Sequence, residues 1–172
     1  MATTNNTITS KGNPLALAGR WPKVGDPAPD FTVLANDLSP VRLSDFKGKT
    51  LVICSVPSLD TSVCDTEVRK FNEHATSLGD DVAVLAVSMD LPFAQKRWCG
   101  AAGVKNVQTL SDHRDASFGN AYGVLIKDLR LLARAVFVVD KDGRIRYIQV
   151  VKELSSEPDY EAALKALRET QG

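Results

Sequence analysis

A cysteine lies where a strand is expected to give way to a helix in PSLDTSVCD, residues 57–65. Thr61 precedes Cys64 by three residues, and Pro57 precedes it by seven. At a helix N-terminus, unpaired N–H groups and the positive end of the helix dipole stabilise a thiolate, the reactive form of cysteine. The spacing also brings the Thr61 hydroxyl within reach of the Cys64 sulfur, or of a molecule bound to it. The segment therefore suggests thiolate chemistry.

The helix N-terminus alone cannot activate a thiol fully. A free thiol with a pKa of about 8.5 is only ~3% ionised at pH 7, and lowering that pKa to about 6 needs ~3.4 kcal/mol. A helix N-terminus supplies about 0.3–1 kcal/mol, or up to about 2 kcal/mol in favourable geometry. A further positive charge is needed, most simply a guanidinium. Arg134, in LARAVFVVD at the start of an expected buried strand, is the candidate, although a solvated strand end explains it equally well.

Each residue of the segment also has an ordinary structural interpretation. Cys64 begins an apolar stripe at helical spacing that continues with Val68 and Phe71, and free cysteine is often buried. Thr61 or Asp60 can cap the helix. Pro57 can simply end the preceding strand.

The other two cysteines have different settings. Cys54 lies within the apolar run LVICSV, where it is expected to pack in the core, and no role is assigned to it. Cys99 follows Trp98 in DLPFAQKRWCGAAG, 35 residues after Cys64. It is either a packed helix cysteine or a partner for Cys64, and the neighbouring glycines make that helix end easy to unwind.

Composition excludes several classes of protein. The 172 residues carry 21 basic and 21 acidic side chains, so no positive excess favours nucleic acid or an anionic membrane. No apolar run is long enough for a signal peptide or a membrane span. Three cysteines, an odd number, favour a reducing, cytoplasmic location. Two histidines and no CxxC pair leave neither a standard zinc site nor a dithiol motif, so no metal is expected.

The order of patterns predicts an α/β protein with a mixed central sheet flanked by helices on both faces. We expect a single domain over residues 1–172, with residues 1–6 flexible. Asp90 is expected to cap the helix that begins near Leu91 or Pro92. The expected elements are an N-terminal hairpin (6–19), strands at 31–37, 40–46, 49–56, 81–90 and 107–112, a helix at 61–78, a helix that begins at 92 and ends within 100–103, a helical turn in 115–124, a hairpin at 133–151 and a helix at 155–169.

The combination of motifs resembles a known family. Pro57, Thr61 and Cys64 match the peroxiredoxin pattern of Pro, three residues, Thr, two residues, Cys. The blocks DLPFAQKRWCGAAG, SDHRDASFGNAYGV, LARAVFVVD and SSEPDYEAALKAL resemble the bacterial thiol peroxidase branch of atypical two-cysteine peroxiredoxins. The resemblance extends from about Ile8 to Leu167 and implies a thioredoxin-like fold with an N-terminal β-hairpin extension.

The resemblance also implies roles for individual residues. Cys64 takes the peroxidatic position and Cys99 the resolving one, and the two form a disulfide in the oxidised enzyme. Pro57, Thr61 and Arg134 occupy the remaining active-site positions.

The implied activity is reduction of hydrogen peroxide and alkyl hydroperoxides by a homodimer that thioredoxin recycles, with no cofactor. Trp98 stands where the family commonly has Phe, a difference expected to affect packing. Two alternatives remain. One is a non-enzymatic redox sensor that uses the same Cys64–Cys99 disulfide. The other is a thiol-disulfide oxidoreductase of the same fold, which the missing CxxC disfavours.

Overall fold

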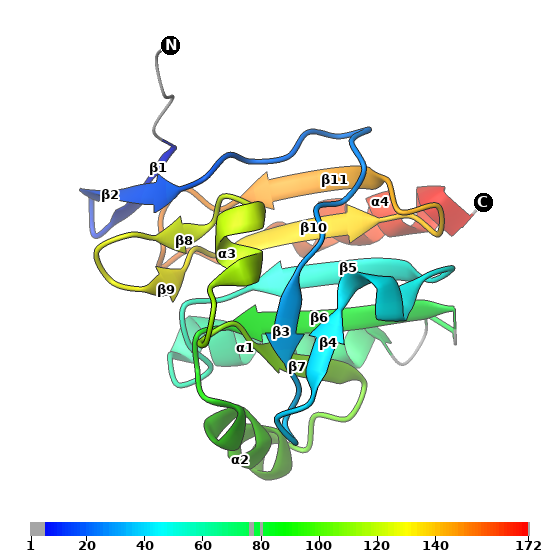
Figure 1. Ribbon diagram of the computed structural model, residues 1–172, viewed down its shortest axis with the longest axis horizontal. Coiled ribbons are helices and arrows are strands. Elements are labelled where there is room, and N and C mark those ends of the chain that lie inside the picture. The colour runs from blue at the N-terminus through cyan, green and yellow to red at the C-terminus, as the bar shows by residue number, and fades with distance from the viewer. Residues whose placement is uncertain (1–5, 76–77, 80, 172) are drawn as a thin grey trace.

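The computed structural model describes residues 6–75, 78–79 and 81–171, and a seven-stranded sheet forms its centre (Figure 1). The strand order is β11-β10-β5-β6-β7-β3-β4. β5, β6 and β7 are parallel, whereas β10, β11, β3 and β4 join by antiparallel pairing. The strands are β3 (Thr32–Leu34), β4 (Pro40–Arg42), β5 (Thr50–Ser55), β6 (Val82–Ser88), β7 (Val107–Ser111), β10 (Ala135–Val139) and β11 (Ile145–Val150).

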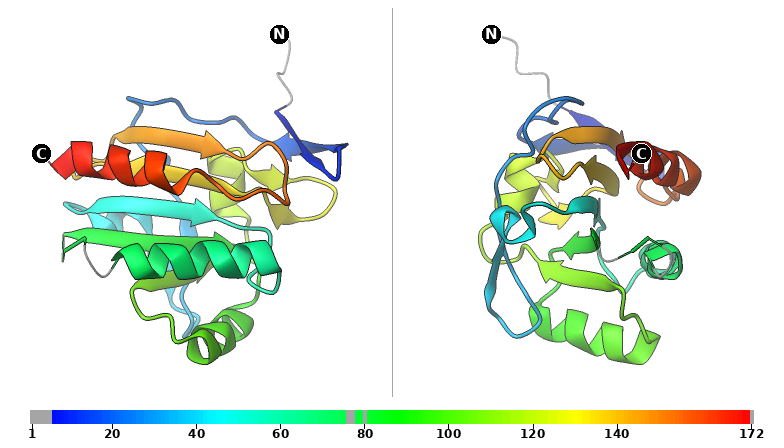
Figure 2. Two further views of the ribbon diagram at one scale, coloured as in Figure 1. Left: turned by 180° about the vertical axis from the view of Figure 1, so that it is seen from behind. Right: turned by 90° about the vertical axis from the view of Figure 1, so that its right-hand side faces the viewer.

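The predicted mixed sheet flanked by helices is confirmed. α1 (Ser62–Ala75) and α4 (Tyr160–Gln171) cover one face, and the short α3 (Ser117–Ala121) lies on the other (Figure 2). α2 (Pro92–Ala102) packs beside β7 at the lower edge in Figure 1. All six residues of β5 are buried, as expected for a continuous apolar strand covered on both faces.

The predicted N-terminal hairpin is also present, but it belongs to a second, four-stranded sheet. β1 (Thr7–Ser10) and β2 (Asn13–Ala18) pair with each other, and β2 pairs with β8 (Leu125–Ile126), which pairs with β9 (Leu131–Leu132). The two-residue strands β8 and β9 were not predicted, because so short a segment carries no alternating pattern. The hairpin thereby lies against the carboxyl end of β11 (Figure 1).

Two local predictions need correction, and a third is confirmed. Asp90 does not cap α2: the N-cap is Leu91 without a side-chain hydrogen bond, and the Asp90 carboxylate binds the loop before α1 instead. The prediction that this helix ends within residues 100–103 is confirmed, because Gly103 ends α2 in the left-handed conformation, at φ 68°. A short 3₁₀ helix, η1 (Leu43–Phe46), follows β4 where a strand was expected to continue.

Two other predictions concern segments that the structure describes only in part. Residues 1–5 of the segment predicted to be flexible lie outside them, and the Asn6 carbonyl accepts a hydrogen bond from the Leu17 N–H at 2.9 Å. α1 is described to Ala75, and Leu78, expected to lie in the same helix, packs against the core. No helix of residues 6–75, 78–79 and 81–171 is long and apolar enough to cross a membrane.

Candidate active site

Cys64 lies in the first turn of α1, which follows β5 after the loop of residues 56–61. Its side chain is fully buried. Thr61 precedes the first helical residue, Ser62, and its hydroxyl accepts a hydrogen bond from the Cys64 N–H at 3.4 Å. The same hydroxyl donates to the Ser58 carbonyl at 3.1 Å. Thr61 is therefore the helix cap, one of the two candidates considered, and it holds the backbone beneath the cysteine.

Arg134 provides the expected charge beside the sulfur. Its Nη1 atom donates to Cys64 Sγ at 3.1 Å, although 70 residues separate the two in sequence. The arginine side chain is only 2% exposed, so the interpretation as a solvated strand end is wrong. Arg134 directly precedes β10, which pairs with β5, and this pairing brings the arginine to the strand end from which α1 departs. A guanidinium suits this position because it stays charged when buried.

Three further hydrogen bonds orient this guanidinium. Nη1 also donates to Glu67 Oε2 at 2.9 Å, while Nε and Nη2 donate to the Leu154 carbonyl at 3.2 and 2.8 Å. Sequence reasoning missed both acceptors. Glu67 could have been recognised from the sequence, because it lies three residues after Cys64 on the apolar face of α1, where a carboxylate needs a partner. No sequence pattern marks the Leu154 carbonyl as an acceptor, since every residue carries a backbone carbonyl.

Glu67 has an unusual environment for a carboxylate. Its side chain is fully buried, and Oε1 has no hydrogen-bond partner within the described part of the chain. Burial raises the pKa of Glu67 from 4.5 to about 7, against the opposing effect of the nearby Arg134 charge. The carboxylate shares the Arg134 Nη1 atom with the Cys64 sulfur, so its protonation changes the charge around the sulfur close to neutral pH.

This shift predicts a pH-dependent difference between wild type and Glu67→Gln. The unfolded chain loses the Glu67 proton near pH 4.5, whereas the folded chain loses it near pH 7. The stability that this group contributes is therefore complete below pH 4.5 and is lost as the pH rises through 7. The free energy of unfolding of wild type should fall relative to the variant by roughly 3 kcal/mol between pH 4.5 and pH 8. Urea unfolding of both proteins at several pH values measures this. Asp112, whose pKa is also raised, to about 6, is common to both and cancels. Parallel stability curves would contradict the prediction.

The loop before α1 is held by Asp90, the residue wrongly assigned as a helix cap. Asp90 Oδ1 accepts from the Ser58 hydroxyl at 2.7 Å, and Oδ2 accepts from the Leu59 N–H at 2.8 Å. Oδ2 also accepts from the Ser88 hydroxyl at 2.7 Å. Pro57 is buried at the start of this loop. Asp90 thus ties the loop that carries Pro57 and Thr61 to the end of β6.

Cys99 lies on α2, partly buried, and its sulfur is 3.2 Å from the Thr109 hydroxyl. All three cysteines, Cys54, Cys64 and Cys99, are free thiols. Cys54 is fully buried in the core, as predicted, and its sulfur donates to the Leu85 carbonyl at 3.4 Å. The structure thus brings Thr61, Cys64 and Arg134 together, while Cys99 lies on a neighbouring element.

Two hydrogen bonds near Cys64 and Cys99 connect α1 with α2. The Trp98 indole N–H donates to Asp65 Oδ1 at 2.8 Å, and Arg69 Nη1 donates to the Ala102 carbonyl at 3.2 Å. Trp98 therefore does more than pack, because a phenylalanine cannot donate this hydrogen bond. Within the described ranges, no three His, Cys, Asp or Glu side chains gather as a metal site would require.

Sequence comparison identifies close relatives of this chain. A family model described as Redoxin matches residues 23–164. The thiol peroxidase of Halalkalibacterium halodurans is 60% identical over 162 residues, which cover 94% of this chain and 97% of that protein. The thiol peroxidase of Bacillus subtilis is 56% identical over 161 residues, which cover 94% of this chain and 96% of that protein.

Structural comparison agrees with the sequence relatives. A peroxiredoxin-like protein from Aquifex aeolicus superposes with a TM-score of 0.90 at 45% identity, covering 95% of this chain and 96% of that one. A thiol peroxidase from Chromobacterium violaceum gives a TM-score of 0.85 at 21% identity over 96% of this chain and 97% of that one, and so bears on the fold alone. The thioredoxin-like fold predicted from the sequence is confirmed. With the Redoxin match and relatives at this level of identity, the chain belongs to the peroxiredoxin family.

Proposed function

We propose that this chain is a thiol-dependent peroxidase that reduces hydrogen peroxide and alkyl hydroperoxides, with Cys64 as the sulfur that the peroxide oxidises. One observation carries the proposal within this family: a buried guanidinium, that of Arg134, donates to Cys64 Sγ at 3.1 Å in the first turn of a helix. A fixed positive charge and the helix N-terminus both favour the thiolate over the thiol. The thiolate is the form of cysteine that attacks peroxide.

The first step transfers one oxygen atom to sulfur. The Cys64 thiolate attacks one oxygen of the hydroperoxide in line with the O–O bond, so an S–O bond forms as the O–O bond breaks. Sulfur is oxidised by two electrons, and the departing oxygen takes a proton and leaves as an alcohol or water. The product on Cys64 is a sulfenic acid, which must be resolved before further oxidation makes the change irreversible.

Preorganised donors lower the barrier to this step. Negative charge moves from sulfur to the departing oxygen, and donors already aimed at both atoms need no reorganisation. Arg134, the Thr61 hydroxyl and the N–H groups of the opening turn of α1 are the proposed donors. Pro57 removes one N–H from the loop and limits access of water. The present hydrogen bonds of Thr61, to Ser58 and from Cys64, keep its hydroxyl within the first turn, ready to exchange partners when peroxide enters.

Cys99 resolves the sulfenic acid in the second step. Its sulfur attacks Cys64 Sγ, an S–S bond forms, the S–O bond breaks, and hydroxide takes a proton to leave as water. A disulfide requires Cα atoms within about 7 Å of one another. The bonds from Trp98 to Asp65 and from Cys99 to Thr109 must open for this approach. Local unwinding of α2 next to Gly100 and Gly103 provides the movement, because glycine weakens a helix.

A dithiol reductant then restores both thiols by disulfide exchange. By family resemblance the reductant is thioredoxin, and the active species is a cytoplasmic homodimer of this single-domain chain. The chemistry requires only sulfur, peroxide and the reductant, so no cofactor is invoked. Each cycle consumes one hydroperoxide and two thiol groups, and produces one alcohol or water from the peroxide together with one further water.

Turnover distinguishes this proposal from a redox sensor that uses the same disulfide. With thioredoxin, thioredoxin reductase and NADPH supplied, a peroxidase consumes many equivalents of hydrogen peroxide per chain, whereas a sensor stops after about one equivalent. NADPH oxidation, followed by absorbance, measures the number of equivalents. Sustained turnover is expected here. Arrest after a single equivalent, with the disulfide formed and thioredoxin active on a control substrate, would support the sensor and overturn the peroxidase proposal.

A further inference from the structure

We infer that the N-terminal hairpin positions Arg134 for the reaction with peroxide, acting through Glu153 and the Leu154 carbonyl. The inference rests on the proposed peroxidase function, since it concerns the group that activates Cys64. It assigns Glu153 as a positioning residue and gives the hairpin a part in catalysis, although neither touches the sulfur or the substrate.

The hairpin is bonded directly to the segment that follows β11. The Thr9 N–H donates to the Lys152 carbonyl at 2.7 Å, and the Leu154 N–H donates to the Thr9 carbonyl at 2.8 Å. These two bonds form a parallel bridge between Thr9 and Glu153. On the hairpin side, the neighbouring Ile8 is 1% exposed within the core, so the hairpin provides a fixed support.

The Glu153 carboxylate reinforces this junction from both sides. Oε1 accepts from the Thr9 hydroxyl at 3.2 Å and from the Gly12 N–H at 3.1 Å, both in the hairpin. Oε2 accepts from the Ser155 N–H at 2.9 Å and its hydroxyl at 2.7 Å. The hydrogen bonds from Ser155, together with those from Gly12 and Thr9, lower the pKa of Glu153 to about 2. The Glu153 carboxylate therefore keeps its charge throughout the pH range of an enzyme assay. Leu154 lies between Glu153 and Ser155, the two residues that these hydrogen bonds fix.

The Leu154 carbonyl determines where the arginine points. It accepts from Nε and Nη2 of Arg134, on one edge of the planar guanidinium, so the remaining nitrogen, Nη1, is directed to Cys64 and Glu67. Because the guanidinium is rigid, a displacement of this carbonyl rotates all of its donors together. A donor that shifts away from the reacting sulfur loses much of its effect on the rate.

A double-mutant cycle on the full chain tests the inference. The rate constant for the first oxidation of reduced protein by hydrogen peroxide is measured by stopped-flow fluorescence for wild type, Glu153→Ala, Arg134→Gln and the double variant. Glu153→Ala should slow wild type about tenfold but slow Arg134→Gln less than about twofold, because the arginine it positions is gone. A purely structural role would give the same factor in both backgrounds. Equal factors, or no loss in wild type, would overturn the inference.

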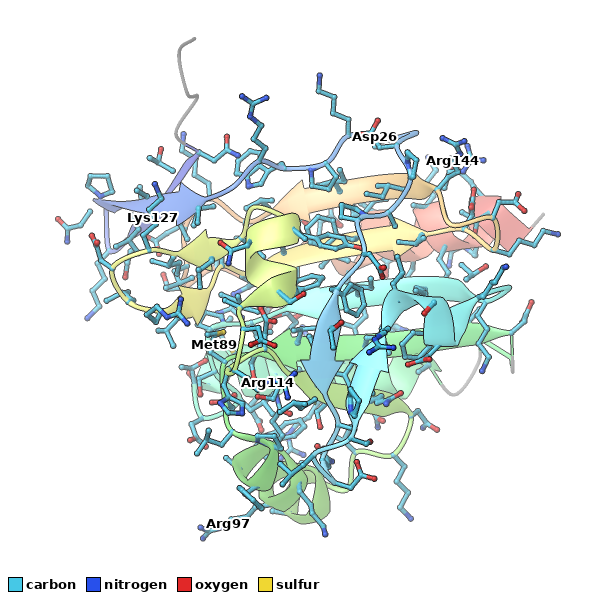
Figure 3. All side chains as sticks on the ribbon, viewed as in Figure 1. Asp26, Met89, Arg97, Arg114, Lys127 and Arg144 are labelled. Carbon is cyan, nitrogen blue, oxygen red and sulfur yellow. The ribbon has the colours of Figure 1, made fainter. Side chains whose placement is uncertain are left out.

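Two further variants separate positioning from loss of folding. Glu153→Gln keeps one carboxamide oxygen as an acceptor, so it should restore part of the rate lost in Glu153→Ala. Asp26→Asn is the matched control. Asp26 Oδ2 accepts a hydrogen bond from the Lys23 N–H at 3.0 Å in an exposed turn that lies near Arg144, just before β11 (Figure 3). The oxidation rate of Asp26→Asn should stay within about twofold of that of wild type. If Glu153→Ala is unfolded by circular dichroism, the Glu153→Gln cycle replaces it: the smaller loss of rate should appear in wild type and be absent in Arg134→Gln, and equal factors would overturn the inference.

The outcome for wild type alone separates this inference from the proposed function. If wild-type Cys64 reacts no faster than a free cysteine, the proposed function fails and the positioning role fails with it. If wild type is fast and the two Glu153 factors are equal, only the positioning role is wrong.

Discussion

Replacing Arg134 with glutamine is expected to slow the oxidation of Cys64 by hydrogen peroxide about 100- to 1,000-fold, the usual effect of removing one preorganised donor from an active site. Glutamine keeps an N–H donor but removes the charge that faces the sulfur at 3.1 Å. Stopped-flow measurement under excess peroxide gives the rate constant directly. Arg134→Lys, which keeps the charge but loses the rigid fork, should lose about tenfold, because lysine cannot donate to Cys64, Glu67 and Leu154 in one fixed geometry.

An arginine away from the site provides the control for this result. Arg146 is about half exposed and pairs with Asp140. Arg146→Gln removes the same charge from the chain, and its rate should stay within about twofold of wild type. Because Arg134→Gln leaves Glu67 buried without its partner, the folded state of the variant must be verified by its unfolding curve before rates are compared. A folded Arg134→Gln protein that reacts as fast as wild type would exclude Arg134 from the activation of Cys64.

Substitution of the two proposed redox cysteines should produce two different failures. Cys64→Ser is expected to abolish peroxide consumption, because a serine hydroxyl is not ionised near neutral pH and is a far weaker nucleophile towards peroxide. Cys99→Ser should consume about one equivalent of peroxide and then stop, without an intramolecular disulfide, because the sulfenic acid has no resolving thiol. Peroxide assays and non-reducing peptide mapping measure both outcomes.

Cys54 supplies the matched cysteine control for these variants. Its sulfur is buried in the core against the Leu85 carbonyl, and burial raises its pKa well above the usual value for a thiol. Such a thiol is a poor nucleophile, so Cys54→Ala should keep both turnover and the disulfide. An unchanged disulfide yield in Cys99→Ser would show that Cys99 is not the partner of Cys64, and would shift attention to Cys54.

The parts of the site that follow local patterns could be predicted from the sequence. The 3-4 spacing of apolar residues after Cys64 indicates α1, and the apolar run before Pro57 indicates β5, so the cysteine was correctly placed at a helix N-terminus. Arg134 could be named as a candidate because a charge at the start of a buried strand needs a partner. Its contact with Cys64 became certain only from the pairing of β5 with β10.

The remaining contacts depend on tertiary structure, which local patterns do not encode. Asp90 has the sequence signature of a helix cap, yet it binds Ser58 and Leu59. The reason is that the fold brings the loops before α1 and α2 together at the carboxyl ends of β5 and β6. The Leu154 carbonyl becomes an acceptor for Arg134 only after the hairpin, β11 and β10 have assembled. Glu67 could have been found from its place on the apolar face of α1, but its partner could not.

Peroxide is expected to oxidise first the sulfur held beside Arg134. Trapping the first sulfenic acid tests it most directly: Cys99→Ser is mixed with one equivalent of hydrogen peroxide in the presence of dimedone, and the labelled peptide is identified by mass spectrometry. The label is expected on Cys64, with Cys54 unmodified. A label on Cys54, with Cys64 recovered as a free thiol, would contradict it.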